Sequence, residues 1–227
     1  EALIATYSEL RPADLANALL DLPDERMIEV AEELDDERLA DVLEELPEEE
    51  QLDIIQELDD ERAAEVLDLM EPDDAADLMA NLSEERTEAI FELMDEEEAE
   101  DIRMLMQFDE FTAGGLMTTE PLICAADMTV AEAMALIRRK EVAPVLAAQV
   151  FVTLPPYETA TGRYLGVVHF QRMLRYPPHE RLGTLLDTEL EPLKSTTHIS
   201  VIHRTLATYN LVALPVVDDE QRLIGVV

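Results

Sequence analysis

Two aspartates, Asp73 and Asp77, stand four residues apart in the stretch EPDDAADL. Residues at this spacing lie on the same face of an α-helix, so the two carboxylates could form half of a metal site. Such a pair suits a hard divalent cation, because Mg²⁺ takes oxygen ligands, retains several waters and needs few carboxylates. Helix capping and simple solvation are the alternative interpretation of the same residues.

Charge divides the chain into two parts. The 227 residues carry 53 acidic and 16 basic side chains, which gives a net charge of −37. Residues 1–110 hold 41 of the acids and 6 of the bases, so residues 111–227 hold the other 12 acids and 10 bases. This field disfavours nucleic acid and anionic lipid as partners of the first part, and it favours cations or basic protein surfaces.

A twelve-residue repeat runs through the acidic part. Its first apolar column consists of Leu10, Leu22, Leu34, Leu46, Leu58, Met70, Leu82, Met94 and Met106. A second column follows eight residues later in each row, and together the columns form the stripe of an amphipathic helix. One long helix is excluded, because twelve residues advance the face by about 120° beyond whole turns and the stripe would spiral. Each repeat is therefore predicted to be a short helix of its own.

Residues that start helices follow the first column directly or one step later. They are Pro12, Pro23, Asp35, Pro47, Asp59, Pro72, Ser83 and Asp95, which are types that favour the N-cap or the first helical position. Helices of about ten residues are marginal alone and must stack on their neighbours. The pattern therefore predicts an α-solenoid of short antiparallel helices over residues 1–108.

The second part of the chain contains a longer unit twice. EPLICAADMTVAEAMALIRR, from Glu120, parallels EPLKSTTHISVIHRTLATYN, from Glu191. Thr129 and Glu132 predict a capping box in the first copy, and Ser200 is the expected N-cap in the second. Each expected helix is followed by two apolar segments separated by a polar turn, so each copy reads as strand, helix, strand, turn, strand.

These paired units, which end in YLGVV and RLIGVV, resemble a tandem of CBS domains. The AGGLMT run in DEFTAGGLMTTE, residues 109–120, resembles the segment that joins an acidic helical N domain to a CBS pair in the MgtE family of magnesium channels. The resemblance implies a multi-domain α and α/β chain: an acidic solenoid over 1–108, a linker over 109–120, a first CBS domain over 121–186 and a truncated second one over 187–227.

The resemblance also implies a function and a set of ligands. In that family Mg²⁺ binds between acidic surfaces of the N domain and the CBS pair and thereby gates a membrane pore. The expected ligands are Asp41, Asp73, Asp77, Asp187, Asp218, Asp219 and Glu220. For the last three, an ordinary solvated hairpin turn is an equally open interpretation. The expected partners are Mg²⁺, a second copy through the CBS domains and the pore domain of the same protein, at the cytoplasmic face of the cell membrane.

Two other functions stay open at this stage. CBS pairs often bind adenine nucleotides, so the chain could be a nucleotide-responsive module whose solenoid docks a basic protein. A passive acidic scaffold is the third possibility. An enzyme is not expected, because the four histidines show no metal-binding spacing and Cys124 has no evident base nearby. No apolar run reaches the length that crosses a bilayer.

Overall fold

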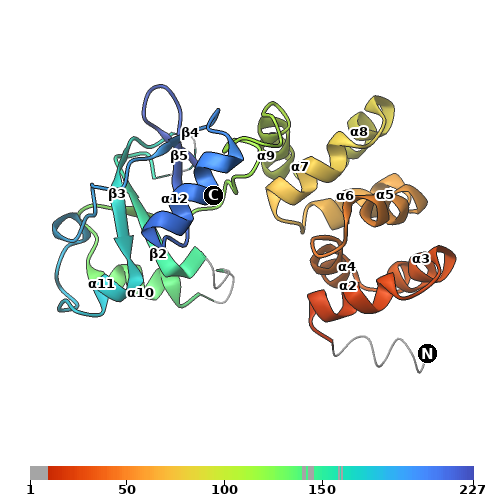
Figure 1. Ribbon diagram of the computed structural model, residues 1–227, viewed down its shortest axis with the longest axis horizontal. Helices are drawn as coiled ribbons and strands as arrows, with labels where there is room; N and C mark the ends of the chain where they lie inside the picture. Colours follow the sequence, from red (N-terminus) through yellow and green to blue (C-terminus); the bar gives the residue numbers. More distant parts are fainter. Residues whose placement is uncertain (1–9, 140–141, 143–145, 158, 160) are drawn as a thin grey trace. The chain divides into compact units, whose positions relative to one another are not determined.

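The computed structural model describes residues 10–139, 142, 146–157, 159 and 161–227 (Figure 1). The chain forms two compact units, Glu1–Met106 and Gln107–Val227. The first unit is helical, and the second contains two small mixed sheets with helices. The predicted fold class is confirmed in its architecture, because a run of short helices is followed by two small mixed sheets with helices.

Short helices make up the first unit. They are α2 (Pro12–Leu20), α3 (Asp24–Glu32), α4 (Asp36–Leu43), α5 (Glu48–Glu57), α6 (Asp60–Leu67), α7 (Pro72–Ala80), α8 (Glu84–Phe91) and α9 (Glu96–Leu105). Helices that are next but one in sequence pack together, so α2, α4, α6 and α8 form one row and α3, α5, α7 and α9 form another. The structural period is therefore two helices, or twice the sequence repeat.

The helix starts agree with the predicted caps. The side chains of Asp35, Asp59, Ser83 and Asp95 each accept a hydrogen bond from a backbone N–H in the first turn of the following helix. Pro23 and Pro47 occupy N-cap positions, and Pro12 and Pro72 are first helical residues. The acidic residues in each first turn lie at the positive end of the helix dipole, which stabilises them there.

One polar residue interrupts the apolar columns. Gln51 is 7% exposed, and its Nε2 donates to the carbonyl oxygens of Leu43 and Leu46, both at 2.8 Å. These carbonyls belong to the end of α4 and the turn after it, where the helix leaves acceptors without intrahelical donors. Gln51 therefore supplies hydrogen bonds to two carbonyl oxygens at a position where most of the other repeats supply an apolar contact.

Arginines tie successive helix pairs together. Arg62, on α6, donates to the carboxylate of Asp36 at 2.9 Å and to the carbonyls of Glu32 and Leu34 at 2.7 and 2.6 Å. Its guanidinium thus joins the end of α3 to the start of α4. Arg86, at the equivalent position two repeats further on, makes corresponding contacts with Asp60, Ile55 and Leu58. A planar guanidinium suits this geometry because it presents several donors in a fixed fork.

The second unit contains two sheets of three strands. The first joins β1 (Ile123–Ala125), β2 (Gln149–Thr153) and β3 (Tyr164–His169), and the second joins β4 (Leu193–Lys194), β5 (Pro215–Val217) and β6 (Leu223–Val226). In each sheet the first pair is parallel and the second antiparallel. The connecting segments include α10 (Val130–Ile137), η1 (Leu146–Ala148), α11 (Phe170–Met173), η2 (Leu182–Thr184) and α12 (Ile199–Tyr209).

The two long helices of this unit start differently. Thr129 and Glu132 form the predicted capping box of α10. The prediction that Ser200 caps the second helix is wrong, because α12 begins at Ile199 and its N-cap is His198. The Nδ1 atom of His198 accepts the backbone N–H of Ser200 at 3.2 Å. An imidazole nitrogen therefore supplies the acceptor expected from the serine hydroxyl.

The AGGLMT segment packs within the second unit. Thr118 and Val226 exchange two backbone hydrogen bonds, of 2.9 and 3.0 Å. Gly225 lies under this segment, and a Cβ built there would come within 2.7 Å of the Met117 sulfur and of the Thr118 carbonyl oxygen. Ala113 and Gly114 donate to the carbonyls of Thr197 and Ser195. The segment interpreted as a linker is thus bonded to the second sheet and to the turn between β4 and α12.

Candidate functional sites

Acidic side chains gather around the N-terminus of α7. Asp73 and Asp77 lie on this helix, as their spacing predicts, and Asp41 lies on α4, in the same unit. The carboxylate of Glu44, the C-cap residue of α4, accepts the backbone N–H of Glu71 at 2.7 Å. This bond fixes α4 next to the start of α7. We call the group Asp41, Glu44, Glu71, Asp73, Asp74 and Asp77 the α4–α7 acidic cluster.

Burial and like charge change the acidity of this cluster. The pKa of Asp74 is raised from 3.8 to about 7, first by burial and then by the neighbouring charges of Asp73, Glu44, Asp77 and Glu71. Burial also raises the pKa of Asp73, with a further contribution from Asp77. The pKa of Glu44 is raised by burial, against the opposing effect of its bond to Glu71. The cluster therefore holds negative charge at a cost that a bound cation would relieve.

The cluster does not form a complete metal site by itself. Among the described residues, no group of three or more aspartates, glutamates, histidines or cysteines is arranged to hold a metal ion. Mg²⁺ can bind through one or two carboxylates and keep several waters. The α4–α7 acidic cluster supplies carboxylate oxygens, which are ligands of the type that such an ion takes.

Asp187 lies in the second unit, beside the first sheet. Its backbone exchanges hydrogen bonds of 2.8 and 3.1 Å with Val167 on β3. One carboxylate oxygen accepts the N–H of Glu189 at 3.0 Å, and the other lies 3.9 Å from His169 Nε2. A Cβ at Gly166 would come within 2.7 Å of the Asp187 carbonyl oxygen, so this close approach requires glycine.

The acids of the β5–β6 turn are engaged by nearby bases. Asp218 accepts both the backbone N–H and the Nε of Arg222, at 2.8 and 2.7 Å. Glu220 pairs with the same guanidinium at 3.0 Å, and Asp219 pairs with Lys194 at 3.4 Å. Although desolvation acts to raise the pKa of Asp218, its bonds to Arg222 together outweigh that effect and lower the pKa. This local neutralisation agrees with the alternative of an ordinary solvated turn more closely than with three metal ligands.

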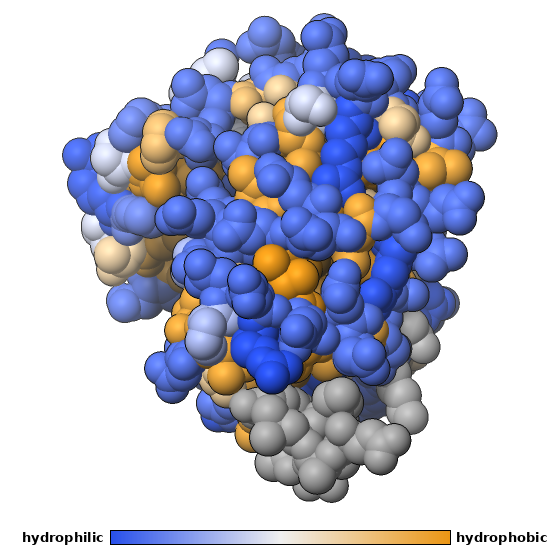
Figure 2. Space-filling view, turned by 90° about the vertical axis from the view of Figure 1, so that its right-hand side faces the viewer, coloured by the Kyte–Doolittle hydropathy of each residue, from blue (hydrophilic) through white to orange (hydrophobic). Residues whose placement is uncertain are grey.

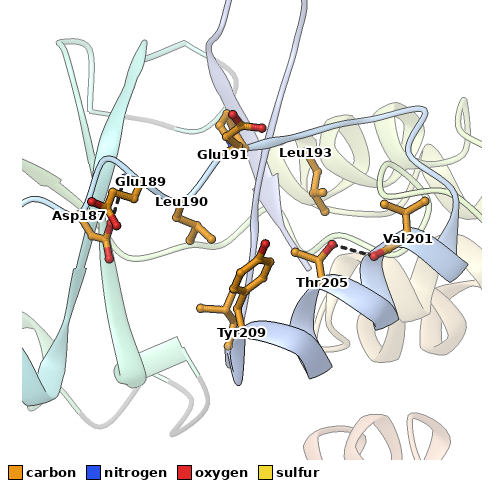
Figure 3. Close-up of a pocket in the computed structure, with 10 residues that line it drawn as sticks. Asp187, Glu189, Leu190, Glu191, Leu193, Val201, Thr205 and Tyr209 are labelled. Atoms are coloured by element: carbon orange, nitrogen blue, oxygen red, sulfur yellow. Dashed lines mark hydrogen bonds between the residues drawn. The ribbon is translucent and has the colours of Figure 1, made fainter.

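A cleft of about 660 Å³ opens near Asp187. It is lined by Asp187, Glu189, Leu190, Glu191, Pro192, Leu193, Val201, Thr205, Tyr209 and Leu211. Figure 3 shows the Tyr209 ring pointing into the space between Leu190 and Thr205, while Asp187 and Glu189 stand on the β3 side. Thr205 is fixed by a bond from its hydroxyl to the Val201 carbonyl. The cleft combines carboxylates, an aromatic ring and apolar walls.

Comparison with known families accounts for both units. The family model described as the MgtE intracellular N domain matches residues 10–111, and the CBS domain model matches residues 113–179 and 182–227. The chain is an MgtE N domain joined to a CBS pair. The first unit is therefore called the N domain and the second the CBS pair. The relatives of this family are a magnesium transporter and the cytosolic domain of a Mg²⁺ channel, which agrees with the expectation of a regulatory region rather than an enzyme.

Individual relatives agree with this assignment. The magnesium transporter MgtE of Thermus thermophilus is 29% identical over 126 residues, which are 56% of this chain. The chain spans 27% of the length of that relative. A crystal structure of the cytosolic domain of the Mg²⁺ channel MgtE in complex with ATP is 27% identical, with a TM-score of 0.86 over 100% of this chain and 90% of the other. The soluble part of a magnesium transporter, at 22% identity and a TM-score of 0.75, shares the fold over 100% of this chain and 92% of its own.

Sequence reasoning missed three members of the α4–α7 acidic cluster. Glu44, Glu71 and Asp74 were not among the expected ligands, although all three lie within the acidic repeats. A signal for Glu44 exists, because Asp68 stands two repeats later and likewise accepts a backbone N–H, that of Asp95 at 3.2 Å.

No helix among the described residues is long and apolar enough to span a membrane.

Proposed function

We propose that the chain is the cytosolic magnesium-sensing region of an MgtE-type channel. In this proposal Mg²⁺ binds between acidic surfaces of the N domain and of the CBS pair, and ion binding regulates a pore elsewhere in the protein. The observation that carries the proposal is the α4–α7 acidic cluster, in which Asp73 and Asp74 have raised pKa values. Mg²⁺, the ion of the similar channel, fits this chemistry because its preferred oxygen ligands are the groups that the cluster supplies.

The physical basis is the removal of repulsion. Two carboxylates 4 Å apart repel by about 4 kcal/mol at an effective dielectric constant near 20. A divalent cation placed between them reverses the sign of that interaction. Two acidic surfaces therefore separate when Mg²⁺ is scarce and approach when it is abundant, because the ion binds the closed state more tightly than the open one.

The proposed ligands differ in how well their surroundings support them. Asp73 and Asp77 are favoured as N domain ligands, with Asp41 as a neighbour. On the CBS pair Asp187 is favoured over the β5–β6 turn, because it lies by a cleft rather than in a network of arginine and lysine contacts. The expected partners are a second copy through the CBS domains and the pore domain, at the cytoplasmic face of the membrane.

Limited proteolysis with and without millimolar Mg²⁺ tests the proposal. The wild-type chain is expected to gain protection with Mg²⁺ and to lose it on chelation, and the D73N/D77N variant is expected to need a higher Mg²⁺ concentration. The matched control is D53N/E57Q, which neutralises another acidic pair four residues apart, exposed on α5. Identical cleavage with Mg²⁺ and with chelator would contradict the proposal, as would equal responses of the two variants.

Adenine nucleotide binding is a second candidate, and the cleft of the CBS pair favours it. A carboxylate such as Asp187 can accept the hydroxyls of a ribose, and the Tyr209 ring, in a residue that is 69% exposed, can stack on a base. The similar structure of the MgtE cytosolic domain was described with ATP. The residues that line the described cleft include no lysine, arginine or histidine, so the phosphates would rely on solvent or Mg²⁺.

Calorimetry with adenosine, AMP and ATP, each with and without Mg²⁺, tests this second function. Binding that weakens in D187N and Y209A supports the cleft as the site. Heats of injection that are the same for nucleotide and for buffer would show that the cleft does not bind the nucleotide. That result would leave the magnesium proposal unaffected.

A further inference from the structure

A basic and apolar turn stands out on the CBS pair. Residues 164–186 contain three arginines and a single acidic residue, Glu180, in a chain whose net charge is −37. The arginines are Arg172, on α11, and Arg175 and Arg181, which follow it. Glu180 accepts the hydroxyl of Thr184 at 2.8 Å. Three arginines against one glutamate leave this segment with a local excess of positive charge.

The same turn exposes apolar side chains. Leu174 is 62% exposed and Tyr176 is 40% exposed, whereas Met173 beside them is buried in the core of the first sheet. Helical hydrogen bonding continues past α11, because Arg175 and Tyr176 donate to the carbonyls of Arg172 and Met173. This continuation gives the turn a defined shape. We call Arg172, Leu174, Arg175 and Tyr176 the α11 patch.

The arginines of the patch have no ionic partner in the described structure. Ion pairs among the described residues involve Arg62, Arg86 and Arg222, among others, but not Arg172 or Arg175. Elsewhere in this acidic chain, arginines of the N domain are used in bonds between helices. Unpaired arginines that flank exposed leucine and tyrosine are the composition of an interaction surface.

The N domain offers a surface of opposite charge that also exposes apolar side chains. Leu69 and Leu93 are 53% and 49% exposed, and they stand two repeats apart, just after α6 and α8. Because α6 packs on α8, these equivalent positions lie along one edge of the solenoid. The residues before them, Asp68 and Glu92, are the C-caps of α6 and α8. We call this surface, with the exposed Glu65, the α6–α8 edge. Figure 2 shows how small the separate hydrophobic patches are on one largely hydrophilic face of the molecule.

Helix polarity makes this edge more receptive to cations. The C-terminal end of a helix carries partial negative charge, which basic side chains in the last turn usually offset. Neither α6 nor α8 has a basic residue in its last turn, and each instead ends beside an acid. Guanidinium groups from outside would therefore meet carboxylates, the ends of two helix dipoles and two exposed leucines.

From this double complementarity we propose that the α11 patch of one copy of the chain docks on the α6–α8 edge of a second copy. Arg172 and Arg175 face the carboxylates of Glu65 and Glu92, and Leu174 and Tyr176 cover Leu69 and Leu93. The contact joins two different surfaces, so every copy has one patch and one edge to offer. It is distinct from a two-fold contact between CBS domains, in which both copies would use the same surface.

Mixing of charge-reversed chains tests the proposal. Sedimentation velocity of the 227-residue chain, in chelator and at low ionic strength, measures self-association over a range of concentrations. R172E/R175E and E65R/E92R are each expected to weaken association by roughly tenfold, because attractive charge pairs between the two surfaces become repulsive. An equimolar mixture of the two variants is expected to recover association, because the intact edge of one pairs with the intact patch of the other and the two charge-reversed surfaces are complementary as well. R204E and E49R are matched controls, because both residues are exposed and lie outside the two surfaces.

Three results would overturn the proposal. Association that is unchanged in both variants would show that other surfaces join the copies, and failure of the mixture to recover it would exclude a contact between unlike surfaces. The third result involves lipid: wild-type chain that sediments with phosphatidylglycerol vesicles but not with phosphatidylcholine vesicles, with loss of binding only in R172E/R175E, would assign the patch to an anionic membrane. Far-ultraviolet circular dichroism of each variant establishes that it is folded.

Discussion

The ionisation of Asp74 gives the most direct test of the electrostatics in the N domain. Its pKa is raised from 3.8 to about 7 by burial and by the neighbouring carboxylates. The folded state therefore favours the protonated form. The stability associated with this group is fully present below pH 3.8, where the carboxyl is protonated in both states. It is lost progressively as the pH rises towards 7, because the unfolded chain ionises first.

The perturbation is D74N, which keeps the shape of the side chain and removes the charge. The shift corresponds to an upper limit of about 4 kcal/mol. Asp74 is only partly buried, so solvent screening reduces the expected gain in the free energy of unfolding to about 1 to 2 kcal/mol. We expect the variant to be more stable than wild type above pH 7, with a difference that shrinks between pH 7 and pH 4.

Urea unfolding followed by circular dichroism, in chelator and across this pH range, measures the difference. D53N is the control, because Asp53 is exposed on α5 and outside the α4–α7 acidic cluster. Parallel pH curves for wild type and D74N would refute the reasoning, since they would mean that folding leaves the Asp74 pKa unchanged. Added Mg²⁺ should reduce the advantage of D74N if the ion binds at the cluster, because the wild-type charge is then compensated.

Three further substitutions test the fold. R62A removes three hydrogen bonds between helix pairs and should lower the free energy of unfolding by about 2 to 3 kcal/mol. R11A removes an ion pair at the surface and should leave the free energy of unfolding nearly unchanged. Urea midpoints compare the two variants. I54A should cost about 2 to 4 kcal/mol by the same assay, because Ile54 is 0% exposed, and a smaller loss would mean that the solenoid core collapses around the cavity. G225A should lower the melting temperature of the chain, because its Cβ meets Met117 and the neighbouring backbone; an unchanged melting temperature would show that the AGGLMT segment can move away from the sheet.

The repeat allowed much of the N domain to be predicted from the sequence. Apolar columns fix which residues are buried, and the residue types after each column fix where helices start, because both are local properties. The packing of alternate helices was not evident from the single repeat. A sign of the two-helix period lies in Arg38, Arg62 and Arg86, because successive arginines of this set stand two repeats apart. The bonds of Arg62 and Arg86 reach back to the preceding helix pair.

The site was predicted less completely, for physical reasons that differ between its residues. Asp73 and Asp77 lie on one helix, so their spacing in the sequence was sufficient to predict that they share a face of it. The role of Glu44 depends on a hydrogen bond to Glu71, between helices that are distant in sequence. The pairing of Asp218 with Arg222 depends on the geometry of one turn, which residue types alone do not specify. The assignment of all seven expected residues as Mg²⁺ ligands stays a prediction.

The arginine bonds of the N domain constrain how the number of its helices can change during evolution. Arg62 and Arg86 each donate to a carbonyl in the turn between the two helices of a preceding pair. Deletion of a single helix would shift these arginines to the other row of helices, away from their acceptors. Loss or duplication of a whole pair would preserve every bond except those at the junction. Natural variation in the size of this domain should therefore occur in steps of two helices, and the gain or loss of an odd number of helices should be rare.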